Sequence, residues 1–214
     1  MSFAAPGKPG RKVILRQANW IRPPGPLSQG LRIGLLGGSF NPAHQGHLHI
    51  SKSAIRTLGL DYVWWLVSPQ NPLKSKSGMA SLGERLNSAR NAAQHPRIIV
   101  TDIETQLDTL YTIETLTVLL RRFPAVHFVW LMGSDNLVQF PYWRNWQDIF
   151  LMTPIAVISR PGSALNARCG TAAQKFAHAR VPANEIFATR LPPAWTIIEA
   201  QRDPTSATQI RSQS

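Results

Sequence analysis

The chain has 214 residues, of which 43% are hydrophobic, so it suits one α/β domain with a real core and excludes a fibrous or wholly disordered protein. Its single cysteine, Cys169, excludes a disulfide within the chain, argues against a cysteine-based metal site and favours a reducing, cytoplasmic setting. The net charge of +12 would suit a nucleic-acid binder, but a large share of the excess precedes the first acidic residue, Asp61, which weakens that interpretation.

The first predicted segment is a basic stretch rich in Pro and Gly over residues 1–30. We interpret it as a flexible extension in front of one domain over residues 31–214. From Leu31 onward, apolar runs of strand length alternate with amphipathic segments. The pattern predicts strands over residues 31–36, 62–67, 97–103, 126–132, 155–159 and 195–199, and helices over residues 47–58, 81–94, 111–123 and 165–178.

This alternation is typical of βαβ units. It predicts an α/β fold: a Rossmann-like, doubly wound parallel sheet of about six strands with helices on both faces. In such sheets, ligands bind beyond the carboxyl ends of the strands, near the point where the strand order reverses. The functional site is therefore expected in the connections that follow the strands.

The connection from the first strand to the first helix, Gly37 to His47, has the composition of a phosphate site. Glycines let the backbone approach a ligand closely, and a helix N-terminus offers N–H groups to an anion. His44 and His47 are three residues apart, so both rings would lie on one helix face and donate to phosphate oxygens. The spacing matches neither the dinucleotide fingerprint nor a Walker A loop, and further zinc ligands are missing. The alternative is a plain strand–turn–helix connection with two exposed histidines.

A second candidate segment, Ser206 to Arg211, lies near the C-terminus. Ser206 is a candidate helix N-cap, Thr208 offers a hydroxyl, and Arg211 offers a planar fork for phosphate oxygens. The alternative is a capped terminal helix without a ligand.

Both segments resemble motifs of the nucleotidyltransferase superfamily. The first resembles the G-x-F-x-P-x-H-x-G-H signature, and the second resembles the S-x-T-x-I-R motif, which contacts the ATP phosphates. The chain agrees with the first signature at Gly38, Phe40, Pro42, His44, Gly46 and His47. Two such motifs in this order imply a transfer of an adenylyl group from ATP.

Other segments are similar to the bacterial nicotinate-nucleotide adenylyltransferases. The segment with Asn71 and Lys74 resembles one that places Lys or His near the phosphates. Tyr111 and Thr112 resemble the S-Y-T element beside the nicotinate ring, with Leu in place of Ser, and Trp143 resembles the tryptophan that stacks on that ring. Taken alone, Lys74 would be a solvated loop lysine and Trp143 core or surface filler.

Two further elements follow predicted strands. Gly133 and Asp135 resemble a G-x-D element near the nucleotide, and Ser159 and Arg160 resemble an R-P-G element near the ligand. Taken alone, Asp135 would be a helix cap. The resemblance runs from about Leu31 to Arg211 and therefore covers nearly all of the predicted domain.

The resemblance implies that ATP and nicotinate mononucleotide give nicotinate adenine dinucleotide and pyrophosphate, in NAD biosynthesis. Related acceptors, nicotinamide mononucleotide or phosphopantetheine, stay open as alternatives, and a nucleic-acid-binding protein is the distant one. The implied catalytic residues are His44, His47, Lys74 and Arg211. Implied ATP-binding residues are Gly37, Gly38, Ser39, Phe40, Gly133, Asp135, Ser159, Arg160, Ser206 and Thr208, and implied acceptor-binding residues are Asn71, Tyr111, Thr112 and Trp143.

Mg²⁺ is expected to arrive with ATP rather than in a dedicated metal site. Nucleic acid and membrane are not expected as partners, since no apolar run approaches the roughly 18 residues that a bilayer requires. A monomer or a small homo-oligomer is expected.

Overall fold

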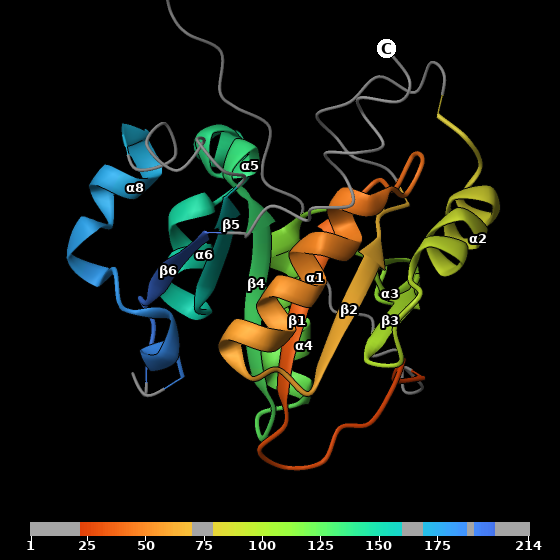
Figure 1. The fold of residues 1–214 in the computed structure, drawn as a ribbon, viewed down its shortest axis with the longest axis horizontal. Helices are drawn as coiled ribbons and strands as arrows, with labels where there is room; N and C mark the ends of the chain where they lie inside the picture. Colours follow the sequence, from red (N-terminus) through yellow and green to blue (C-terminus); the bar gives the residue numbers. More distant parts are fainter. Residues whose placement is uncertain (1–21, 70–78, 160–168, 188–190, 200–214) are drawn as a thin grey trace, which may run out of the picture.

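The computed structural model describes residues 22–69, 79–159, 169–187 and 191–199. Six parallel strands form one sheet in the order β3-β2-β1-β4-β5-β6, which confirms the predicted doubly wound fold (Figure 1). The strands are β1 (Arg32–Gly38), β2 (Tyr62–Val67), β3 (Ile98–Thr101), β4 (His127–Gly133), β5 (Ile155–Ser159) and β6 (Trp195–Glu199). The α-helices are α1 (Gln45–Leu58), α2 (Leu82–Ala92), α3 (Ile103–Gln106), α4 (Thr112–Arg122), α5 (Ser134–Gln139), α6 (Trp146–Met152) and α8 (Thr171–Lys175). The 3-10 helices among the described residues are η1 (Phe140–Tyr142), η2 (Ala177–Ala179) and η3 (Ala183–Glu185).

The strand order reverses between β1 and β4, which pair in register from Arg32 opposite His127 to Leu36 opposite Leu131. The chain winds outward from β1 through β2 to β3 on one side and from β4 through β5 to β6 on the other. The ends of β1 and β4 therefore bring Gly38 and Gly133 together at the point where such sheets bind ligands.

Helices cover both faces of the sheet, as Figure 1 shows for α1 and α4 on opposite sides. One core joins α1 and α2 to the sheet through side chains such as Ile55, Leu86 and Trp65. The other core joins α3, α4, α6 and α8 to the opposite face. The largest side chains buried in the two cores are Trp64, Trp65, Trp130, Trp195, Phe40, Phe140 and Phe150. The strands are continuous apolar runs in the sequence because both faces of the sheet are buried.

The caps of α1 define the helix that carries the histidine pair. His44 is the N-cap with an extended backbone, so the helix starts two residues earlier than predicted. Gly59 ends the helix in the left-handed conformation, at φ 62°, and donates its N–H to the Ile55 carbonyl. Glycine is favoured there because it adopts a positive φ without steric cost.

Two predicted elements are wrong in part. The strand predicted to reach Ile103 ends at Thr101, whose Oγ1 accepts the Ile103 N–H at 3.1 Å as α3 begins. In its described part, the helix predicted over residues 165–178 consists of a helical residue at Cys169, the short α8 and then η2. Helix α8 starts after the extended Gly170 and ends at Phe176. Residues 165–168 of the predicted helix lie outside the described residues. Helices α5 and α6 were not predicted.

The end of the predicted extension packs on the domain. Leu27 lies against the core that contains α4, and the Gly30 N–H donates to the Ala125 carbonyl at 2.8 Å. Residues 1–21 of that extension lie outside the described residues. No helix in the described part of the chain combines the length and the apolarity that crossing a bilayer requires.

Candidate active site

A cavity of about 760 Å³ lies at the carboxyl ends of β1, β4 and β5. Its volume is within the range of small-molecule and cofactor sites. The structure brings together most of the described residues that the sequence assigned to the site. Those that line the cavity are Gly37, Gly38, Ser39, His44, His47, Tyr111, Thr112, Gly133, Asp135, Trp143 and Ser159.

The remaining predicted residues fall into two groups. Phe40 is described, but it is 1% exposed and is not part of the cavity lining. The others lie outside the described residues: Asn71, Lys74, Arg160, Ser206, Thr208 and Arg211.

The backbone at the start of α1 sets the tautomer of both histidine rings. The Nδ1 of His44 accepts the Gly46 N–H at 3.1 Å, and the Nδ1 of His47 accepts the His44 N–H at 3.2 Å. A ring nitrogen that accepts carries no hydrogen, so the proton of each neutral imidazole is on Nε2. The two ring centroids are 4.0 Å apart, and both residues line the cavity. The first turn of α1 contains no acidic residue, so the positive end of the helix dipole also suits an anion here.

The Phe40 ring packs against the ring of His47. Its ring centroid lies 4.6 Å from that of His47 and 5.1 Å from that of Trp65, on which it stacks. The Trp65 indole N–H donates to Ser51 Oγ at 2.7 Å, and this hydroxyl donates to the His47 carbonyl at 2.9 Å. Phe40 has a left-handed backbone, at φ 47°, a conformation that persists in a non-glycine residue only where its surroundings hold it. The phenylalanine of the motif therefore positions the histidine rather than contacting the cavity.

Gly37 lets a tryptophan lie beneath the cavity. A Cβ at this position would lie 2.6 Å from Cη2 of Trp130, which is closer than non-bonded carbon atoms approach in proteins. Trp130 lines the cavity and packs edge-on against Trp143, with ring centroids 6.2 Å apart. The glycine is thus required by the packing of an aromatic side chain, in addition to any contact with phosphate.

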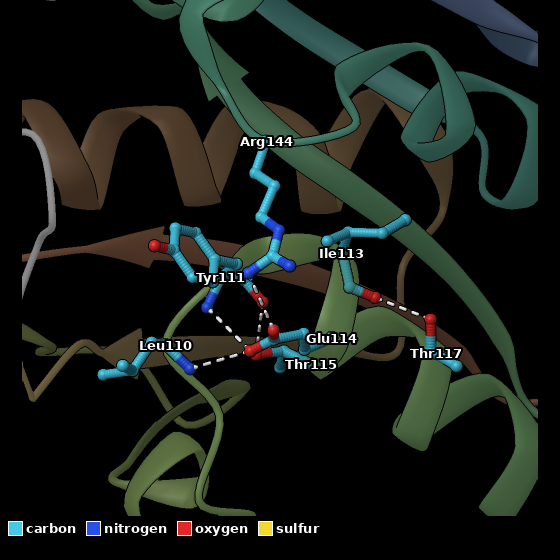
Figure 2. A network of polar contacts seen from close by, with 7 residues as sticks. All are labelled: Leu110, Tyr111, Ile113, Glu114, Thr115, Thr117 and Arg144. Atoms are coloured by element: carbon cyan, nitrogen blue, oxygen red, sulfur yellow. Dashed lines mark hydrogen bonds and ion pairs between the residues drawn. The ribbon is translucent and has the colours of Figure 1, made fainter. Parts of the chain in front are cut away.

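Tyr111, the N-cap of α4, belongs to a polar network that the sequence did not indicate (Figure 2). The Arg144 guanidinium carbon lies 4.6 Å from the centre of the Tyr111 ring, and Arg144 Nη1 is 3.5 Å from Glu114 Oε1. Glu114 Oε2 accepts the backbone N–H groups of Leu110 at 3.2 Å and Tyr111 at 3.4 Å. Both Tyr111 and Arg144 line the cavity, so this network fixes one of its walls.

Glu104, on α3, is a buried carboxyl group in the cavity lining. Thr115 Oγ1 donates to Glu104 Oε1 at 3.2 Å and lies 2.9 Å from Thr109 Oγ1. Burial raises the pKa of Glu104 to about 7, although hydrogen bonds with Thr115 and Ser68 oppose the rise. The network joins the end of β2 to α3 and to the first turn of α4, which carries Tyr111. No pattern in the sequence indicated this network, because the burial arises only when α3 folds against the sheet.

Arg85, on α2, holds together the loops that follow β1 and β2. This residue is only 2% exposed. Its Nη1 donates to the Ser39 carbonyl at 2.8 Å and the Ser68 carbonyl at 2.6 Å. Its Nη2 and Nε donate to the carbonyls of Pro69 and Ala80 at 3.0 and 3.1 Å. Ser39 and Ser68 line the cavity, so Arg85 shapes the site from behind it.

A doubly wound sheet with a histidine-bearing helix N-terminus at its switch point is the arrangement of an α/β protein whose site suits phosphate groups. The chain belongs to the cytidylyltransferase-like family, whose model matches residues 35–213, and it is a nucleotidyltransferase.

Two curated relatives cover most of the chain. A protein of Parvibaculum lavamentivorans named "Probable nicotinate-nucleotide adenylyltransferase" is 53% identical over 189 residues, which are 86% of this chain and 93% of the relative. A protein of Roseobacter denitrificans with the same name is 50% identical over 182 residues, which are 84% of this chain and 91% of the relative.

A solved structure, Plasmodium falciparum nicotinic acid mononucleotide adenylyltransferase complexed with NaAD, matches with a TM-score of 0.62. The match covers 85% of this chain and 83% of the solved chain, at 16% sequence identity. At that identity, the likeness shows a shared fold.

Proposed function

We propose that this chain transfers the adenylyl group of ATP to nicotinate mononucleotide, giving nicotinate adenine dinucleotide and pyrophosphate, as a step of NAD biosynthesis. The observation that carries the proposal is a single cavity with two kinds of lining. The His44 and His47 pair at the start of α1 suits phosphates, and the aromatic side chains of Tyr111 and Trp143 suit a flat ring. The names of relatives at about half identity supply the acceptor.

The reaction needs positioning and charge rather than a strong base. The acceptor phosphate attacks the α-phosphorus of ATP in line, so a new P–O bond forms as the bond to the departing pyrophosphate breaks. The attacking group is already an anion, and catalysis rests on orientation and on stabilising the charge that develops. The Nε2–H groups of His44 and His47 donate to the phosphate oxygens. We propose that Lys74 and Arg211, which lie outside the described residues, add positive charge.

Mg²⁺ is proposed to enter as part of the ATP substrate, where it neutralises phosphate charge. Within the described ranges, no three His, Cys, Asp or Glu side chains gather as a protein metal site would require. Mg²⁺ bound to nucleotides usually takes phosphate oxygens, waters and one or two carboxylates. Asp135 lines the cavity just after β4 and fits the role of such a carboxylate.

Pyrophosphate release measured with ATP and nicotinate mononucleotide tests the proposal, with nicotinamide mononucleotide and phosphopantetheine in parallel. Release should be fastest with nicotinate mononucleotide, and absent release with it would overturn the acceptor. His47→Ala should lower kcat by about 100-fold or more, the usual effect of removing one donor to developing charge. His178→Ala, at an exposed position of η2, is the matched control. Turnover of His47→Ala near that of the control would contradict the role of His47.

A further inference from the structure

Resting on the proposed function, we infer that Arg144 binds the carboxylate on the acceptor's pyridine ring and so selects an acidic acceptor over its amide counterpart. The inference starts from the position of this side chain. Arg144 follows Trp143 directly, and both line the cavity together with Tyr111 and Thr112. The guanidinium therefore lies at the aromatic end of the cavity, where a flat ring would stack.

The positive charge of Arg144 at that end of the cavity favours an anionic ring substituent. Among the described lining residues, Arg144 is the single Lys or Arg side chain. The acidic residues of the described lining are Glu104 and Asp135. An amide brings no charge to the guanidinium, whereas a carboxylate forms charge-assisted hydrogen bonds with it, and these are roughly twice as strong as neutral ones.

The guanidinium is held in place before any ligand arrives. It lies over the Tyr111 ring, 4.6 Å from its centre, and Glu114 Oε1 accepts from its Nη1 at 3.5 Å (Figure 2). The other oxygen of Glu114 accepts the N–H groups of Leu110 and Tyr111, which ties the carboxylate to the start of α4. A guanidinium has five N–H donors. Since Glu114 takes one of them, the same group can be anchored by Glu114 and still offer donors to a ligand.

The test compares kcat/KM for nicotinate mononucleotide with kcat/KM for nicotinamide mononucleotide at saturating ATP and Mg²⁺. Arg144→Gln should lower this ratio by about 10- to 100-fold, the range expected for a lost hydrogen bond to a charged group. The loss should appear mainly as a higher KM for the acidic acceptor. Arg144→Lys keeps the charge and should retain more of the ratio. Arg122→Gln, exposed at the far end of α4, is the matched control and should leave the ratio unchanged.

A second variant separates recognition from structural support. Glu114→Gln removes the ion pair but keeps an oxygen for the backbone N–H groups, so the acceptor ratio should hold or rise. The inference is overturned if Arg144→Gln leaves the ratio unchanged, lowers kcat/KM for both acceptors equally, or matches Glu114→Gln. Wild-type protein that releases no pyrophosphate with nicotinate mononucleotide overturns the proposed function itself, a result visible before any variant is compared.

Discussion

Replacing Glu104 with glutamine should stabilise the protein in a pH-dependent manner. This carboxyl group is 7% exposed, and burial raises its pKa to about 7 from an ordinary value of 4.5. Glutamine keeps the shape of the side chain and an oxygen that can accept from Thr115 Oγ1, but it has no charge to bury. The variant therefore isolates the cost of ionising this one buried group.

The sign follows from comparing the folded and unfolded states. In the unfolded protein Glu104 ionises near pH 4.5, whereas in the folded protein it keeps its proton until about pH 7. Between these values the folded state binds more protons, so the free energy of unfolding falls as pH rises. At about 1.4 kcal/mol per pH unit, the difference corresponds to about 3 kcal/mol above pH 7. Below pH 4.5 that penalty is absent.

Urea unfolding of the wild type and of Glu104→Gln, at pH 4.5 and at pH 8, measures this difference. The variant should match the wild type at the lower pH and exceed it by about 3 kcal/mol at the higher pH. Asp108→Asn makes the same acid-to-amide change at an exposed position and serves as the matched control. An equal offset between Glu104→Gln and wild type at both pH values would refute the argument, since it would show that Glu104 does not ionise differently on folding.

Two other substitutions test the supports of the site. Arg85→Met should destabilise the protein by on the order of 3 kcal/mol, because buried carbonyl groups lose a charged donor, while Arg90→Met, exposed on the same helix, should change urea unfolding little. Gly37→Ala should destabilise by about 1–3 kcal/mol, since its Cβ would overlap Trp130, whereas Gly83→Ala meets open space in α2 and should raise the melting temperature. Equal effects of Arg85→Met and Arg90→Met would contradict the hydrogen-bonding argument, and equal effects of Gly37→Ala and Gly83→Ala would contradict the packing argument.

The sequence predicted the elements whose pattern is long enough to carry a period. Buried strands such as β2 and β5 fall on the predicted residues, and α1 ends at Gly59 as its left-handed cap requires. Helices α5 and α6 span 6 and 7 residues, too few for a helical period to be distinguished from a loop. The helix predicted over residues 165–178 is interrupted in the structure, because local amphipathicity cannot show that the backbone leaves the helical conformation at Gly170 and again at Phe176.

The sequence predicted residues that the fold brings to one cavity, but it did not reveal the contacts that shape this cavity. Resemblance to family motifs pointed to His44, His47, Tyr111 and Trp143, and the fold brings them to one cavity. Arg144 is adjacent to a predicted residue, yet its importance depends on contacts with Tyr111 and Glu114 from another element. Such contacts join residues about 30 positions apart, and no local spacing encodes them.

The structure also changes the interpretation of the motif from Gly37 to His47. Its histidines accept backbone hydrogen bonds through Nδ1, so under the proposed function the N–H groups at the start of α1 would act on a phosphate partly through the imidazole rings that they orient. Gly37 makes room for Trp130, whose ring in turn packs edge-on against Trp143. The phosphate end and the aromatic end of the cavity are therefore linked by direct packing across the switch point. Under the proposed function, a larger side chain at Gly37 would therefore alter the binding of the acceptor ring as well as the binding of ATP.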